Sequence, residues 1–355
     1  MLNIGFLKGK VDLKCPISPD LIKKYQSISL NILAEKGINE AAFFATGRYE
    51  GVEMVDRMEV VKKSDILFCS ENISNEELSN IKETAHFISL LEPYNNKEVE
   101  GQMQAYPFKT FSMDMIPRTS LAQSMDVLSS MASVAGYKAV LKAADLLPRY
   151  LPMMITAAGS IKPSKVLVIG AGVAGLQAIA TARRLGAMVE AFDVRSASKE
   201  EVESLGAKFV EVEGAADDKG AGGYAVQQSE DFLKRQQAEV QKRASNADII
   251  ITTAQLRGRP APKLILKETV NNMKPGSVII DLASSTGGNC EVTEDQKTIQ
   301  VNGVTIVGNS ALANEMIQDA SNLLSNNIFN FVNIMVKDGA LHYDSENEIL
   351  VKSKL

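Results

Sequence analysis

The sequence predicts an α/β protein made of two Rossmann-like, doubly wound domains with mostly parallel sheets and a cleft between them. Short apolar runs of strand length, such as Val166–Ile169 and Val278–Leu282, alternate with helical segments along the chain. This alternation is typical of parallel sheets covered by helices on both faces. A length of 355 residues is sufficient for two domains of ordinary size. A G-x-G-x-x-G turn occurs at Gly170–Gly175 in the second half of the chain.

Composition excludes several classes of function. Hydrophobic residues make up 45% of the chain, the net charge is −5 and no basic block occurs, so nucleic acid is not an expected partner. No apolar run approaches the roughly 18 residues needed to insert directly into a membrane. The N-terminus begins on a strand and shows no signal peptide. Cys15, Cys69 and Cys290 are widely spaced, which favours reduced thiols in a cytosolic protein. With only His86 and His342 as histidines, no metal site is expected.

The first domain is expected to cover residues 1–129 together with 316–355. It has no glycine-rich phosphate turn. Ser18 and Pro19 are typical of a helix start, and Ser74 is a candidate cap for another helix. Strands are expected at Leu2–Phe6, Ala41–Phe44, Ile66–Cys69, Phe87–Leu91 and Lys109–Met115. Helices are expected at Pro19–Glu35, Tyr49–Val61, Asn75–Glu83 and Asn95–Ala105.

One long helix, or two, is expected between Ser120 and Tyr150, joining the first domain to the second. Gln123, Asp126 and Ser129 follow one another at intervals of three residues. They can therefore share a helical face or the inner side of a loop. Spacing alone leaves open whether these side chains form a site or a solvated polar surface.

The second domain is expected at residues 130–315. Gly214–Gly223 reads as a mobile loop that ends at Tyr224. Strands are expected at Val166–Ile169, Ala187–Phe192, Lys208–Val212, Asp248–Thr252, Ser277–Leu282 and Val304–Val307. Helices are expected at Leu176–Leu185 and from a start at Ser198–Glu201. A separate long polar helix is expected after Tyr224, through about Ser245, and a last helix at Glu315–Met335 returns to the first domain.

The Gly170–Gly175 turn follows a strand and opens a helix, as a dinucleotide fingerprint requires. Gly170 permits the tight turn, Gly172 lets a pyrophosphate approach the backbone, and Gly175 allows close packing of helix and strand. Asp193 ends the next strand, where a carboxylate accepts hydrogen bonds from a ribose diol. A 2′-phosphate would meet a like charge there, which favours NAD over NADP, although Arg195 lies nearby. The alternative is a glycine-rich turn that binds no nucleotide.

Several segments of the chain resemble the NAD(H)-binding component of the proton-translocating NAD(P) transhydrogenase family. They include PRTSLAQSMDVLSSMASVAGYKAV, GAGVAGLQAIATARRLGA, DVRSASKEEVESLGAKF, AGGYA, GRPAPKLI and MKPGSVIIDLASSTGGNCEVT. The similarity is dense from about Thr110 to Gly308. Alanine dehydrogenases are the nearest relatives of this family.

The resemblance implies that the chain binds NADH and transfers a hydride to NADP held on a separate component. A membrane-spanning component would couple this transfer to proton translocation. The resemblance further implies a symmetric homodimer whose contacts come mainly from the second domain and its Gly214–Ser245 segment. A cytoplasmic location, peripheral to the inner membrane through partner subunits, follows from the same reading.

The resemblance also assigns site residues. Arg118, Gln123, Asp126 and Ser129 correspond to the family's constellation near the nicotinamide. Arg118 would pair with Asp126, and Gln123 would hydrogen-bond the carboxamide. Tyr224 would close over bound nucleotide. The expected cofactor-binding residues are Gly170, Gly172, Val173, Gly175, Asp193, Val194, Arg195, Gly223, Tyr224, Gln236, Ala254 and Gln255.

Three segments depart from the family pattern, namely 12–16, 255–258 and 311–315. The last two are expected near the nucleotide pocket or the face toward the partner component. Two alternative functions remain. An alanine dehydrogenase would need a His, an Arg and a Lys for its substrate, yet FISLLEP offers no His and Lys14 stands where Arg is expected. The other alternative is an NAD-binding protein without turnover. We expect no dehydrogenase activity of the chain alone on small substrates.

Overall fold

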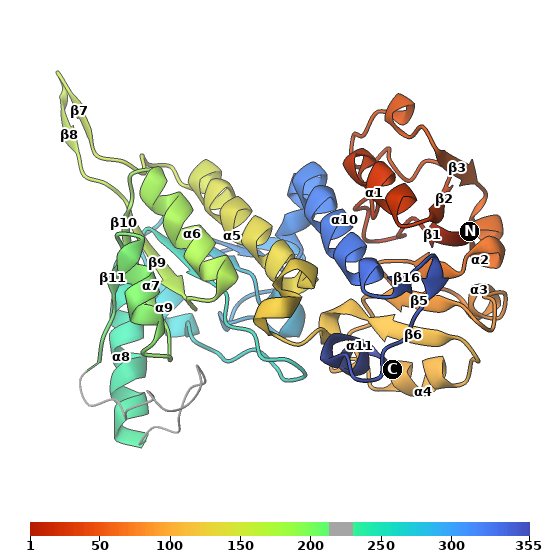
Figure 1. Cartoon of the computed structure of the whole chain (residues 1–355). Coiled ribbons are helices and arrows are strands. Elements are labelled where there is room, and N and C mark those ends of the chain that lie inside the picture. The colour runs from red at the N-terminus through yellow and green to blue at the C-terminus, as the bar shows by residue number, and fades with distance from the viewer. Residues whose placement is uncertain (213–229) are drawn as a thin grey trace. The chain divides into compact units, whose positions relative to one another are not determined.

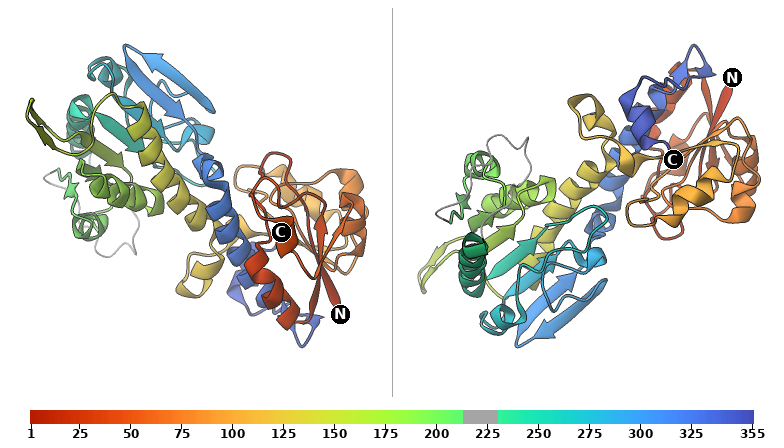
Figure 2. Two further views of the ribbon diagram at one scale, coloured as in Figure 1. Left: turned by 90° about the horizontal axis from the view of Figure 1, so that it is seen from above. Right: turned by 90° about the horizontal axis from the view of Figure 1, so that it is seen from below.

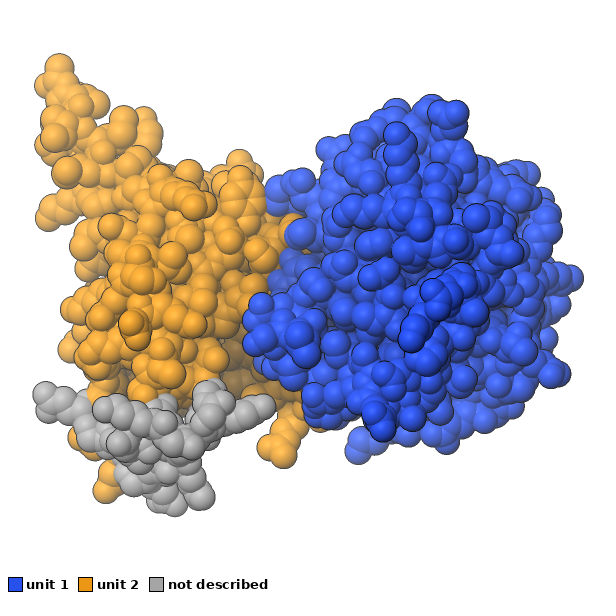
Figure 3. All heavy atoms as spheres, viewed as in Figure 1, with its two compact units in different colours: residues 1–131, 316–355 blue, residues 132–315 orange. Residues whose placement is uncertain are grey.

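The computed structural model describes residues 1–212 and 230–355. The chain divides into two compact units, which Figure 3 shows in different colours. Unit 1 comprises residues 1–131 and 316–355, and unit 2 comprises residues 132–315. Each unit contains one large, mainly parallel sheet. The predicted α/β fold class with two mostly parallel sheets is therefore confirmed.

The sheet of unit 1 has six parallel strands in the order β3-β2-β1-β4-β5-β6. This is the doubly wound Rossmann order, in which the chain changes direction between β1 and β4. The strands are β1 Leu2–Phe6, β2 Leu30–Glu35, β3 Val52–Val55, β4 Ile66–Phe68, β5 His86–Ser89 and β6 Lys109–Ser112.

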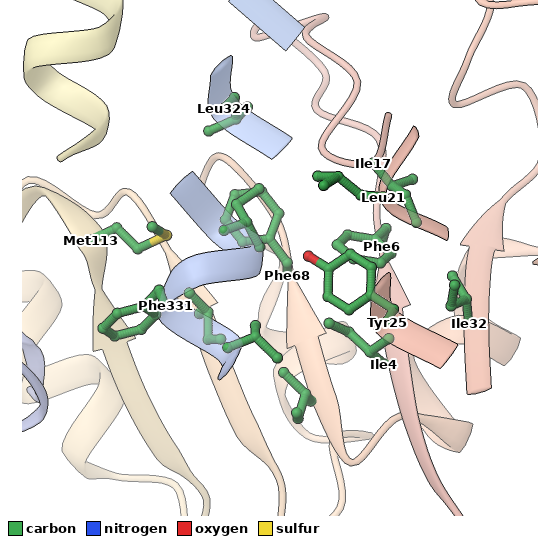
Figure 4. Close-up of a cluster of buried hydrophobic side chains, with 14 of the residues drawn as sticks. Ile4, Phe6, Ile17, Leu21, Tyr25, Ile32, Phe68, Met113, Leu324 and Phe331 are labelled. Atoms are coloured by element: carbon green, nitrogen blue, oxygen red, sulfur yellow. The ribbon is translucent and has the colours of Figure 1, made fainter. Parts of the chain in front are cut away.

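Helices cover both faces of this sheet. Ile4, Phe6 and Phe68 pack on one face in a cluster that also contains Tyr25 and Phe331 (Figure 4). Side chains of alternate strand positions form a second cluster with the other helices. The helices are α1 Ile22–Ser27, α2 Arg57–Lys63, α3 Asn75–Leu78, α4 Glu98–Gln104, α10 Ile317–Asn333 and α11 Glu348–Ser353.

Three expectations for unit 1 are wrong. The helix predicted to run to Glu35 ends at Ser27, and residues 30–35 form the inner strand β2. Ser29 has a φ of +63°, which stops the helix, and Leu30, Ile32 and Ala34 then alternate into the core. Ala41–Phe44 is a turn, not a strand. Residues 49–61 are divided between β3 and α2, because the edge strand is too short to show a clear period.

The sheet of unit 2 has seven strands in the order β11-β10-β9-β12-β13-β15-β14, and only β14 is antiparallel. The chain changes direction between β9 and β12, so the carboxyl ends of these two strands mark the expected ligand crevice. The strands are β9 Lys165–Ile169, β10 Met188–Phe192, β11 Lys208–Phe209, β12 Ile249–Thr252, β13 Val278–Asp281, β14 Lys297–Val301 and β15 Val304–Gly308.

Helix α5 (Val127–Leu146), which lies in unit 2 from residue 132 onward, and helix α6 (Val173–Arg184) lie side by side in Figures 1 and 2. A Cβ added to Gly136 of α5 would lie 2.1 Å from the carbonyl oxygen of Ala174 in α6. Only glycine therefore permits this close approach, so α5 is seated directly on the first turn of α6. The described residues of this unit also form the helices α7 (Ser198–Ser204), α8 (Glu230–Asn246) and α9 (Lys267–Asn271).

Sequence reasoning missed two features of unit 2. Strand β14 is mostly exposed and polar, so it lacks an apolar strand signal. The hairpin of β7 (Met154–Thr156) and β8 (Gly159–Ile161) forms a sheet of its own, and all six of its residues are exposed. None of the helices within 1–212 and 230–355 is long and apolar enough to cross a membrane.

Candidate functional site

The glycine-rich turn of unit 2 lies between β9 and α6. Gly170 has a φ of +96°, and a Cβ there would lie 2.5 Å from the hydroxyl of Thr253. A Cβ on Gly175 would lie 1.8 Å from the carbonyl oxygen of Gly170, whereas one on Gly172 would meet no atom within 4 Å. Gly170 and Gly175 thus let the turn close on itself, and Gly172 leaves open space beside the start of the helix. This geometry suits a phosphate at the N-terminus of α6.

The strand after the crossover supports this turn. The hydroxyl of Thr253, at the end of β12, donates a hydrogen bond of 3.0 Å to the carbonyl of Gly170. Ala254 is fixed by Asn289, whose side chain accepts from the Ala254 N–H at 3.0 Å and donates to the Ala254 carbonyl at 2.9 Å. Gln255 is exposed and donates to the carbonyl of Leu282 at 2.9 Å. The structure therefore places Ala254 beside the glycine turn, since a Cβ on Gly170 would lie 3.4 Å from the Ala254 nitrogen, and Gln255 is the next residue in the chain.

Asn289 was not identified from the sequence, although it lies in the GGNC segment that carries the resemblance. Its side chain is fully buried and also donates to the carbonyl of Pro262 at 2.9 Å. Asp281, at the end of β13, accepts hydrogen bonds from the N–H groups of Ala283 and Cys290 and from the hydroxyl of Thr293. In the sequence, the feature that could have pointed to Asn289 is a polar residue directly after two glycines in a loop.

Asp193 follows β10, as predicted, and its side chain is only 6% exposed. Its carboxylate accepts the N–H of Ala171 at 2.7 Å and the N–H of Arg195 at 2.8 Å. The guanidinium of Arg195 donates two more hydrogen bonds, both of 2.9 Å. Burial alone raises the pKa of Asp193, but the hydrogen bonds from Arg195 and Ala171 outweigh burial and hold this pKa below its usual value.

The other expected cofactor-binding residues are less tightly placed. Val173 is the first residue of α6, and Val194 follows Asp193; both side chains are about half exposed. Gln236 lies half-buried on α8. Gly223, Tyr224 and the expected mobile loop at 214–223 lie outside the described residues.

The residues expected near the nicotinamide lie in unit 1, around the start of α5. A short 3-10 helix, η4 (Ser120–Met125), ends at Asp126, and α5 begins at the next residue. The carboxylate of Asp126 accepts the N–H of Ser129 at 2.9 Å and its hydroxyl at 2.6 Å. Asp126 and Ser129 thus cap the helix instead of sharing a helical face with Gln123.

Arg118 and Gln123 are exposed, and within 1–212 and 230–355 Arg118 forms no ion pair with Asp126. The hydrogen bonds that the structure gives the Asp126 carboxylate come from Ser129 in the cap. The side-chain amides of Asn327 and Asn330 on α10 donate to the carbonyl of Ser124 at 2.8 and 3.0 Å. These two contacts, over 200 residues apart in sequence, hold η4 in place and could not be deduced from local patterns.

Two of the departures from the family pattern carry charged pairs. In the segment at 12–16, the buried Lys14 forms an ion pair of 2.6 Å with Asp12. In the segment at 311–315, Glu315 pairs with Lys142 at 2.6 Å and with Lys138 at 3.4 Å, both from α5. The charged side chains Asp12, Lys14 and Glu315 of these two segments therefore each form an ion pair.

Two family models match the chain. The N-terminal domain of alanine dehydrogenase/PNT matches residues 10–135, and its C-terminal domain matches residues 139–354. Together they span nearly the entire sequence.

The chain belongs to the alanine dehydrogenase/PNT family, on its transhydrogenase branch.

Relatives on this branch are similar over nearly the full chain. The first part of NAD(P) transhydrogenase subunit alpha from Rhodospirillum rubrum is 42% identical, over 94% of this chain and 88% of that protein. The corresponding protein of Rickettsia prowazekii is 40% identical, over 97% and 92%. The crystal structure of transhydrogenase from Sinorhizobium meliloti superposes with a TM-score of 0.90 at 40% identity, covering 99% of this chain and 98% of that one. The predicted resemblance and the predicted enzyme class, an NAD(P) transhydrogenase alpha subunit, are confirmed.

An L-alanine dehydrogenase structure has a TM-score of 0.77 at 21% identity, over 99% of this chain and 94% of that one. This likeness shows a shared fold and nothing more. His86, the first residue of β5, is buried inside unit 1 and does not lie at the carboxyl end of a strand. It therefore does not supply the acid or base that an amino-acid dehydrogenase site would need.

Proposed function

We propose that the chain binds NAD(H) on the Gly170–Gly175 turn of unit 2 and serves as the NADH side of hydride transfer to NADP. The observation that carries this proposal is the turn itself. Its open space at Gly172, its helix N-terminus and the carboxylate of Asp193 at the end of the next strand together suit a dinucleotide. The nicotinamide supplies the hydride, and the protein supplies position and electrostatics.

NADP is expected on a separate transhydrogenase component, and a membrane-spanning component is expected to couple the transfer to proton translocation. The names of the relatives, which describe portions of a subunit, support this arrangement. In this arrangement the chain lies at the membrane surface, held there by its partner components. The direct test is a cyclic hydride-transfer assay with the NADP-binding component added. Nucleotide binding without turnover under these conditions would contradict the proposal, as would NADH oxidation that depends on pyruvate and ammonia.

Gln123 is proposed to orient the nicotinamide ring, together with Arg118 and the cap formed by Asp126 and Ser129. The exposed amide of Gln123 has no protein partner within the described ranges that would have to be displaced. Gln123→Asn shortens the reach of the amide by one methylene and should disturb ring placement more than binding. We expect NADH affinity to change by less than about tenfold, or 1.4 kcal/mol, while single-turnover hydride transfer falls much more. Equal losses in both measurements would make Gln123 a plain binding residue.

The chain is also proposed to form a homodimer through unit 2. The β7–β8 hairpin carries Ile155 and Ile161, which are 74% and 40% exposed, and Met153 directly before it is 61% exposed. A hairpin that pairs with nothing else is at best marginally stable in water, and exposed apolar side chains of this kind favour a protein contact. Light scattering should give twice the chain mass. Ile155→Asp should shift that mass toward the monomer, and a monomeric unmodified protein at micromolar concentration would refute the dimer.

A further inference from the structure

The carboxylate of Asp193 is fully engaged by the protein itself. One oxygen accepts the N–H and the Nε–H of Arg195, and the other accepts the N–H of Ala171 and an Nη2–H of Arg195. Each oxygen therefore already accepts two hydrogen bonds, which is the capacity of its two lone pairs. The hydroxyl groups of a ribose have no free acceptor on this side chain.

The two partners differ in their freedom to move. Asp193 is 6% exposed and is fixed from the side of the glycine turn by the N–H of Ala171 at 2.7 Å. The side chain of Arg195 is 35% exposed, and Glu201 at the start of α7 lies near enough to act on its charge. A long exposed side chain that has a second carboxylate within electrostatic range can leave, whereas a buried side chain held by the backbone cannot.

We propose that Arg195 is an internal competitor for the ribose-binding carboxylate and thereby sets the discrimination between NAD(H) and NADP(H). The guanidinium must release Asp193 before the adenosine ribose can donate its hydroxyl groups there. After its release the guanidinium remains near Asp193, because Arg195 is only two residues further along the chain, and its positive charge offsets the repulsion between Asp193 and a 2′-phosphate. Arg195 therefore weakens NADH binding and strengthens NADPH binding. This inference rests on the proposed binding of NAD(H) to unit 2.

The structure supports competition in preference to direct binding of the diol. A guanidinium has five donors and no acceptor, so it can donate to a ribose hydroxyl oxygen but cannot replace the carboxylate as the acceptor of the hydroxyl protons. Its planar fork is matched to a carboxylate or a phosphate, and the 2′-phosphate is the one group that separates NADP from NAD at this position. Arg195 thus has opposite effects on the two nucleotides through the same atoms.

The test is equilibrium binding of NADH and NADPH to the full-length chain, measured by nucleotide fluorescence for the unmodified protein, Arg195→Gln and Arg184→Gln. Arg184 is exposed at the end of α6, and Arg184→Gln removes the same positive charge, so this variant is the matched control. We expect Arg195→Gln to bind NADH several-fold more tightly and NADPH several-fold more weakly, so that the ratio of the two dissociation constants rises about tenfold. Arg184→Gln should leave this ratio unchanged.

A double-mutant cycle with Asp193→Asn separates competition from other effects. If Arg195 acts by occupying Asp193, Arg195→Gln should no longer tighten NADH binding once the carboxylate is an amide. Weaker binding of both nucleotides to Arg195→Gln would make Arg195 a direct ligand and overturn the inference. Unchanged binding of both would remove Arg195 from the site. An unmodified protein that binds neither nucleotide would instead refute the proposed function.

Discussion

His86 should make the stability of unit 1 depend on pH. Its side chain is 3% exposed, its ring packs 5.3 Å from that of Phe111, and its Nδ1 atom has no partner within the described ranges. Burial, and secondarily the positive charge of Lys109, lower the pKa of His86 from 6.5 to about 4. The folded protein therefore keeps this imidazole neutral at pH values where the unfolded chain would protonate it.

The sign and size of the effect follow from this difference. The unfolded chain binds the extra proton below about pH 6.5, so the free energy of unfolding should fall as the pH drops from 6.5 toward 4. One pKa unit corresponds to about 1.4 kcal/mol, so the full loss is about 3 kcal/mol, reached below the folded pKa. Above about pH 6.5 the contribution of His86 should no longer change with pH.

Urea unfolding of the unmodified protein and His86→Leu at neutral pH and at about pH 4.5 would measure this contribution. The leucine variant should lose roughly 2 kcal/mol less stability between these two conditions, because it has no proton to bind. His342→Gln is the matched control, since His342 is the other histidine and is exposed. Parallel pH dependence of the unmodified protein and the leucine variant would refute the reasoning.

Three further predictions concern unit 2. Gly172→Ala should weaken NADH binding but leave the unfolding midpoint nearly unchanged, because its Cβ would meet no atom of the described residues within 4 Å. Gly175→Ala should weaken NADH binding and also lower the free energy of unfolding by about 1–3 kcal/mol, because its Cβ would lie 1.8 Å from the Gly170 carbonyl oxygen. Equal stabilities of the two variants would contradict this. Gly136→Ala should destabilise by a similar amount through its contact with Ala174, while Gly101→Ala, which meets nothing within 4 Å, should not. Asp248→Asn should lower the free energy of unfolding in urea by about 1–2 kcal/mol, because the 5%-exposed carboxylate binds the half-exposed Arg149 and Lys274. An unchanged free energy of unfolding would show that solvent screens both ion pairs.

The elements of the fold that were predicted correctly are those whose signal is local. Strands β1, β4, β9 and β12 are apolar runs buried in the middle of parallel sheets, so their burial is visible in the sequence. The glycine turn carries its own geometric requirements at fixed spacing. Asp193 follows from the same pattern, because its position is set by the length of one strand–helix–strand unit.

The elements that could not be predicted depend on residues distant in sequence. The pattern of strand β2 favours a helix, because Leu30, Leu33 and Ala34 fit a helical period until β1 and β3 pair with the segment on either side. Asp126 binds Ser129 in a helix cap, whereas the sequence suggested Arg118 as its partner, and nothing in the spacing distinguishes the two partners. Asn327 supports η4 from the far end of the chain. Propensity and period alone do not encode such contacts.

The two units share a strand order at the crossover, yet only unit 2 is expected to hold a dinucleotide. In unit 1 the loop after β1 has its backbone N–H groups occupied by carboxylates of the same unit. Glu71 accepts from Lys10, Val11 and Asp12, and Glu35 accepts from Lys8 at 2.8 Å. A negative group of the protein thus takes the place that a phosphate takes at a dinucleotide crevice.

Arg57 reinforces this occupation of the unit 1 crevice, because its guanidinium binds Glu35 and the Lys8 carbonyl at 2.8 and 2.7 Å and also Glu77. A phosphate entering there would have to displace carboxylates, one of them Glu35 paired with Arg57, that already bind the N–H groups of Lys8, Lys10, Val11 and Asp12. In unit 2 the carboxylate of Asp193 binds the N–H of Ala171, but a Cβ added to Gly172 would meet no atom within 4 Å among the described residues, so the start of α6 stays open. We therefore expect calorimetric titration to give one NADH per chain, and a second site of similar affinity would show that the carboxylates of unit 1 do not exclude phosphate.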